Sequence, residues 1–147
     1  MNIDPTCPEP NGFVLRVDIP GTLPSLNQTY KARAVSTRGR RPFAHLYKSA
    51  TIKAWQARVE ALADKAALGR RPCFDGPVVL EAHLRFARES SLAPNLAFGD
   101  IDGPVKALLD ALSGIAYQDD VQVVRLIVDK QLDRHNPGVL VFVSETR

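Results

Sequence analysis

The sequence predicts an α+β fold in a single domain, with a small mixed β-sheet of about four strands packed against two helices. Three observations support this prediction. The chain has 147 residues, which is the size of one domain. Four segments have the alternating or β-branched pattern of strands, and two have the apolar spacing of helices. The composition, with 45% hydrophobic and 24% charged residues, is ordinary for a soluble globular protein.

The four strand segments fall into two kinds. Two alternate apolar and polar side chains, which is typical of a strand with one buried face, and two are β-branched runs separated by a polar turn. Every second residue from Leu80 to Phe86 is expected to face the core. His83 points the other way, beside Glu81, and is expected to be a surface or cross-strand residue rather than a metal ligand. The segments are 13–19, 79–87, 121–128 and 139–143.

Two segments are expected to form helices. In residues 49–68, apolar residues recur at spacings of three and four, Ser49 is a suitable N-cap, and Gly69 stands at the stop position. A shorter helix is expected to open at Gly103-Pro104, because proline costs nothing in the first turn of a helix. Its leucines form a stripe that faces the core, and Gly114 ends it.

Two further segments lack such patterns. Residues 1–12 are rich in Pro, Asn and Gly and are expected to form a flexible N-terminal tail, which leaves the domain to residues 13–147. Residues 20–46 contain Pro, Gly and many arginines, and are expected to form a long loop. A loop of this length in a small domain is usually functional.

Composition excludes several classes of protein. The chain is not a disordered acidic tail, a collagen-like chain or a disulfide miniprotein. No apolar run approaches the ~20 residues of a membrane span, and the N-terminus has neither the basic start nor the apolar core of a secretory signal. We therefore expect a cytoplasmic protein that does not contact membranes. Cys7 and Cys73 form no CxxC pair and are expected to be reduced thiols.

The charge of the chain is unevenly distributed. The formal net charge is +3, but residues 28–75 contain eleven basic and three acidic side chains, a net charge of +8. Residues 95–120 contain five aspartates and one lysine, a net charge of −4. A basic region beside a compact acidic cluster suits a phosphate-rich polymer that is gripped in one place and cut in another. The alternative is ordinary solvated surface charge. The residues expected to grip a phosphate backbone are chiefly Arg33, Arg38, Arg40, Arg41 and Lys48.

The acidic cluster has a spacing that suits a metal site. Asp100 and Asp102 stand two apart on what is expected to be an extended stretch, so both carboxylates can point to one side. Lys106 follows one helical turn after Asp102 and is expected to stack above it. The chain then returns through a glycine turn to Asp119-Asp120, at the start of the next strand. Converging carboxylates need a cation, and oxygen ligands suit Mg²⁺ or Mn²⁺ rather than zinc.

These aspartates have two other interpretations. Aspartate also favours helix caps and turns, and for any single residue of the cluster that interpretation is the better one. A calcium-binding EF-hand loop is excluded, because Pro104, Val105 and Ala111-Leu112 stand where that loop needs an acid or amide, a glycine and a glutamate.

The acidic block resembles the signature of the RusA-type Holliday junction resolvases. That family shows D-[LIV]-D-N-x-x-K-x-x-x-D-A-L, then a glycine-containing turn, then an aspartate pair that opens a strand. The residues that carry the resemblance are D-I-D at 100–102, Lys106, L-D-A-L at 109–112 and Y-Q-D-D at 117–120. The resemblance extends over residues 13–143, although only this block is specific. Gly103-Pro104 stands where the family has its asparagine and the next residue.

The resemblance implies a RusA-like fold and a small homodimeric, Mg²⁺-dependent endonuclease. Such an enzyme resolves four-way (Holliday) DNA junctions by paired symmetric nicks during recombination and repair. By position, the metal-binding acids correspond to Asp100, Asp102 and Asp120, the catalytic lysine to Lys106, and the supporting aspartates to Asp110 and Asp119. For Asp110, a plain helix-surface position is an equal alternative.

A second hypothesis is a non-catalytic accessory protein that binds branched DNA and has a degenerate metal site. It shares the basic region and the fold, and differs in having no metal-dependent cutting. Flaps and replication forks are alternative substrates to four-way junctions. Phe98, on the loop before the acidic block, is expected to pack against the protein rather than wedge into the centre of a junction.

Overall fold

The computed structural model describes residues 12–25, 30–36, 38–41 and 43–146. The expected N-terminal tail therefore lies outside the described residues, apart from Gly12. The predicted fold class is confirmed: the structure is a mixed α+β domain with a four-stranded sheet and two α-helices.

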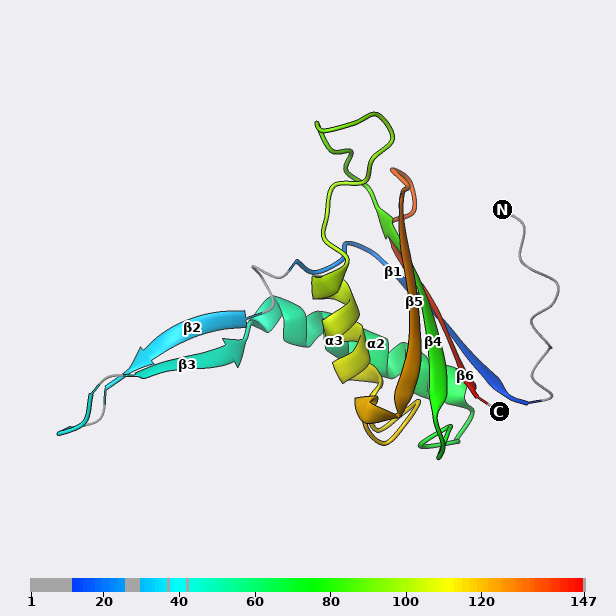
Figure 1. Ribbon diagram of the computed structural model, residues 1–147, viewed down its shortest axis with the longest axis horizontal. Coiled ribbons are helices and arrows are strands. Elements are labelled where there is room, and N and C mark those ends of the chain that lie inside the picture. Colours follow the sequence, from blue (N-terminus) through cyan, green and yellow to red (C-terminus); the bar gives the residue numbers. More distant parts are fainter. Residues whose placement is uncertain (1–11, 26–29, 37, 42, 147) are drawn as a thin grey trace.

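Four strands form the central sheet in the order β1-β6-β4-β5 (Figure 1). β4 and β5 are parallel, whereas β6 is antiparallel to both of its neighbours, so the sheet is mixed. β5 stands at one edge of this sheet and β1 at the other. The strands are β1 (Val14–Pro20), β4 (Val78–Phe86), β5 (Val123–Leu132) and β6 (Gly138–Glu145).

Two helices, α2 (Ala50–Ala67) and α3 (Asp102–Leu112), cover one face of the sheet, as Figure 1 shows. Burying the facing apolar side chains stabilises the fold by a free energy of about 25 cal/mol per Å² of apolar surface removed from water. Phe86, at the end of β4, packs against this core but is only partly buried. The buried apolar residues of these four strands are Leu15, Val17, Ile19, Val78, Leu80, Ala82, Leu84, Val139, Val141 and Val143.

Helix α2 begins and ends where the sequence predicts. The Ser49 hydroxyl oxygen accepts a hydrogen bond from the N–H of Ile52 at 3.3 Å, which satisfies one of the free donors of the first turn. At the other end, Leu68 adopts a left-handed conformation with a φ of 52°, and Gly69 follows with a φ of 81°. This change of hand stops the helix.

Residues 30–48 overturn one expectation. Instead of a long loop they form an antiparallel hairpin of β2 (Tyr30–Val35) and β3 (Phe43–Lys48), which projects from the body of the protein in Figure 1. The two strands form a sheet of their own. The alternation of apolar and basic residues in this segment covers only residues 30–34, which is short beside the many Pro, Gly and Arg residues that favoured a loop. Gly39, with a φ of 86°, lies between the two strands.

The approach to β5 also differs from the prediction. Asp120 does not open the strand but begins a short 3₁₀ helix, η1 (Asp120–Gln122), which precedes it. An Asp119 carboxylate oxygen accepts from the N–H of Val121 at 2.9 Å, and the Gln122 amide oxygen accepts from the N–H of Asp119 at 3.2 Å. This reciprocal capping closes a turn before the chain can extend.

Two expectations about the class of protein concern membranes and thiols. Within the described part of the chain, no helix is long and apolar enough to cross a membrane. Cys73 is a free thiol, and burial raises its pKa, with a smaller opposing effect from Arg70. Cys7 lies outside the described residues.

Candidate active site

One face of α3 carries three of the predicted site residues. Asp102, Lys106 and Asp110 are each one helical turn apart, and residues four apart lie on the same face of a helix. The opposite side of the helix is buried in the core. Lys106 Nζ donates to Asp110 Oδ1 at 2.8 Å. Lys106 therefore pairs with the aspartate one turn later, whereas the sequence spacing had suggested Asp102.

The turn before β5 brings Asp120 to the same place. Its Oδ2 lies 3.6 Å from Lys106 Nζ. Lys106 thus connects α3 to the aspartate pair, although the two parts of the motif are separated by a helix and a turn. The side chains of Lys106 and Asp120 are 49% and 41% exposed, so a substrate can reach them.

The buried Tyr117 supports the end of α3 beside the contact between Lys106 and Asp120. The Tyr117 hydroxyl donates to the backbone oxygen of Leu109 at 3.0 Å. Burial, and then the negative charges of Asp120 and Asp110, raise the pKa of Tyr117 above its ordinary value. The phenol therefore keeps its proton at neutral pH, and it fixes the last turn of α3 beside the two aspartates.

Asp100 and Asp102 are exposed at the N-terminal end of α3. The expectation that they lie on an extended stretch is wrong, because Ile101 between them is helical, with φ −77° and ψ −42°. The backbone oxygen of Ile101 accepts from the N–H of Val105 at 3.3 Å, so the helical turn already starts there. The carboxylate of Asp102, in the first turn, is stabilised by the positive end of the helix dipole.

The loop that precedes Asp100 is fixed from β5. Lys130 Nζ donates to the backbone oxygens of Ala97 at 3.2 Å and Gly99 at 2.8 Å. Gly99 has a φ of 147°, and a Cβ at this position would collide with the ring of Phe86. Lys130 is 31 positions from Gly99, and nothing in the local sequence pattern predicts this contact.

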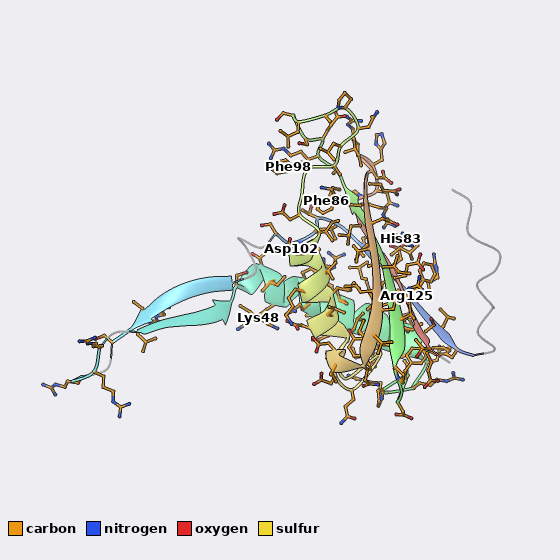
Figure 2. All side chains as sticks on the ribbon, viewed as in Figure 1. Lys48, His83, Phe86, Phe98, Asp102 and Arg125 are labelled. Carbon is orange, nitrogen blue, oxygen red and sulfur yellow. The ribbon has the colours of Figure 1, made fainter. Side chains whose placement is uncertain are left out.

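Phe98, on this loop, packs against a neighbouring side chain and is partly exposed to solvent. Its side chain is 53% exposed, and the guanidinium of Arg88 lies 4.5 Å from the centre of its ring. Phe98, Arg88 and Asp100 line a cavity of about 340 Å³ (Figure 2 labels Phe98 and Phe86).

A divalent cation is the group that this donor set implies. Carboxylate oxygens of Asp100, Asp102 and Asp120 have the chemistry that Mg²⁺ and Mn²⁺ prefer, and all three side chains are at least partly exposed. However, among the residues that the structure describes, no group of three His, Cys, Asp or Glu side chains is placed to hold a metal ion. The donor types fit the cation, and the gathering of the three acids stays a prediction.

The predicted DNA-binding residues divide into two groups. Lys48 is the last residue of β3, where the hairpin meets the body, and its Nζ lies 3.5 Å from Asp110 Oδ2. The other group is exposed on the hairpin away from this contact. Its members are Arg33, Arg38, Arg40 and Arg41.

An α+β domain that presents aspartates and a lysine beside a projecting basic hairpin has the parts of a DNA-cutting enzyme. The family model described as endodeoxyribonuclease RusA matches residues 24–144 of the chain. The chain therefore belongs to the RusA family of endodeoxyribonucleases, which are Holliday-junction-resolving enzymes and are typically metal-dependent. A search of the curated proteins found no match.

Proposed function

We propose that this chain is a Mg²⁺-dependent, structure-selective endodeoxyribonuclease that resolves four-way DNA junctions by paired symmetric nicks during recombination and repair, in the cytoplasm. Membership of the RusA family supports the junction substrate. The observation that carries the location of the site is the 3.6 Å contact between Lys106 and Asp120. It joins the two halves of the family motif on an accessible surface of the protein.

The proposed roles follow from residue chemistry. Asp100, Asp102 and Asp120 would hold Mg²⁺, or Mn²⁺ as a substitute, which supplies charge neutralisation and an activated water when bound. Lys106 presents an ammonium group beside Asp120, where it stabilises negative charge that develops on phosphate oxygens. Asp119 caps η1 and so fixes the backbone from which Asp120 projects.

The hairpin is proposed to grip the substrate. Its exposed arginines can neutralise backbone phosphates without reading base sequence. A homodimer is also proposed, since a four-way junction presents two equivalent scissile strands to a two-fold symmetric protein. Light scattering of the free protein and of its junction complex measures this directly, with two copies expected in each.

Cleavage of a labelled synthetic four-way junction tests the proposal. We expect paired nicks in Mg²⁺ and none in EDTA. Asp102→Asn should cut at least about a hundredfold more slowly and still bind the junction. Glu60→Gln, which changes an exposed acid on α2, is the matched control and should cut at the wild-type rate. Full nicking by Asp102→Asn refutes the assignment. Flaps and forks at equal concentration establish the preferred substrate.

The second candidate function is a non-catalytic accessory protein that binds branched DNA. One observation favours it: in the described residues, the three acids are not in positions to ligate one metal ion. Tight junction binding with no metal-dependent nick, in either Mg²⁺ or Mn²⁺, supports this candidate over the nuclease.

A further inference from the structure

The carboxylate of Asp110 contacts two lysines at once. Its Oδ1 accepts from Lys106 Nζ at 2.8 Å, and its Oδ2 lies 3.5 Å from Lys48 Nζ. The Asp110 side chain is 22% exposed, while those of Lys48 and Lys106 are 35% and 49% exposed. One shielded carboxylate therefore holds two more accessible ammonium groups next to each other.

The position of Lys48 is set by the body of the protein as well as by the hairpin. Lys48 Nζ donates to the side-chain oxygen of Gln56 at 3.4 Å. Gln56 is buried in α2, and its side-chain N–H donates to the backbone oxygen of Ala107 in α3 at 3.0 Å. Figure 2 labels Lys48 where β3 runs into the body. These contacts tie Lys48 to the helix that carries Lys106.

Two lysines and two aspartates form this cluster, and their charges balance only while all four are paired with one another. Lys48 and Lys106 carry two positive charges, and Asp110 and Asp120 carry two negative ones. When Asp120 is engaged by another group of the site, the remaining three carry a net charge of +1. An excess positive charge at this point favours the binding of a phosphate.

We propose that Asp110 is a positioning residue that holds Lys48 and Lys106 as a pair, and that Lys48 acts on the DNA phosphates in the cutting step. This inference rests on the proposed endonuclease activity. Of the two contacts that Asp110 makes with lysines, the one to Lys48 is the longer, at 3.5 Å against 2.8 Å. Lys48 is therefore the lysine that exchanges the Asp110 carboxylate for a phosphate. It thereby differs from the arginines of the hairpin, which grip the substrate at a distance from the cut.

Single-turnover cleavage with enzyme in excess tests the role of Lys48. Lys48→Met should lower the saturating rate at least about tenfold, with the junction dissociation constant changed less than about threefold. Lys48→Arg keeps the charge and should restore most of the rate. Lys65→Met, which removes an exposed lysine in the last turn of α2, is the matched control. If Lys48→Met weakens binding but leaves the saturating rate intact, Lys48 is only a binding contact and the inference is wrong.

The role of Asp110 is tested by a double-mutant cycle. Asp110→Asn should slow cutting, Asp110→Glu should recover part of the rate, and the effect of Asp110→Asn should shrink in the Lys48→Met background, because coupled residues are not additive. Equal effects in both backgrounds, or a rate loss that only follows a lower melting temperature, contradict the positioning role.

If wild-type protein does not cut in Mg²⁺, the proposed function itself fails. If wild-type protein cuts and these variants cut as well as it does, only this inference fails.

Discussion

The α3 site (Asp102, Lys106, Asp110 and Asp120) and the β2–β3 hairpin differ in how the protein supports them. α3 packs its apolar side into the core, and Tyr117 fixes its last turn. The hairpin strands pair with each other in a separate sheet and project from the body (Figure 1). Rigid support suits residues that must hold a reacting phosphate in place, whereas exposed positive charge suits a long substrate. We therefore expect that substitutions in the two regions can lower the cleavage rate and the affinity for DNA separately.

The largest expected effect is on the stability of the body. Leu108 is fully buried on α3, and Leu108→Ala should lower the free energy of unfolding by about 2–5 kcal/mol. Arg33→Gln changes an exposed side chain on the hairpin and should change this free energy by less than about 0.5 kcal/mol. Urea denaturation measures both. Similar losses in the two variants would mean that the hairpin shares the cooperative core.

The next effect concerns affinity. Replacing Arg38, Arg40 and Arg41 together by glutamine should weaken junction binding about tenfold or more, because phosphate contacts are lost. The slope of log Kd against log salt should fall by about one for each contact removed. Arg16→Gln, which changes an exposed arginine on β1, is the control and should leave both quantities unchanged. An unchanged salt slope in the triple variant would show that the hairpin does not contact phosphates.

The smallest effect is at the cap of η1. Asp119→Ala removes the acceptor for the N–H of Val121 and should cost about 1 kcal/mol of stability. It should also slow cutting, because the turn that presents Asp120 is loosened. Asp119→Asn keeps a good cap and should preserve stability. If Asp119→Asn is stable but fails to cut, the charge of Asp119 takes part in the chemistry directly.

Periodic patterns made the central fold predictable. The alternation in β1 and β4 and the leucine stripe of α3 exist because one face of each element packs into the core. The hairpin has only a short alternation, at residues 30–34, and was expected to be a loop. The cap at Ser49 was predicted, whereas the one at Asp119 was missed, although Asp119 and Gln122 have the local spacing of a capping box.

The site was predictable only in part. The spacing of Lys106 and Asp110 places them together on any helix, whereas the extended backbone expected at Ile101 was wrong. Contacts between distant segments left no sequence signal: Gln56 and Ala107 are 51 positions apart, so the link between α2 and α3 appears only in the fold. The same holds for the approach of Lys48 to Asp110.

We propose that cutting takes place where Lys106 meets Asp120. Single-turnover cleavage of a four-way junction by Asp120→Asn in Mg²⁺, with the dissociation constant measured in parallel, tests it most directly. We expect a rate at least about a hundredfold below wild type, with the dissociation constant changed less than about threefold. Cutting by Asp120→Asn at the wild-type rate would contradict it, because the chemistry would then lie elsewhere in the protein.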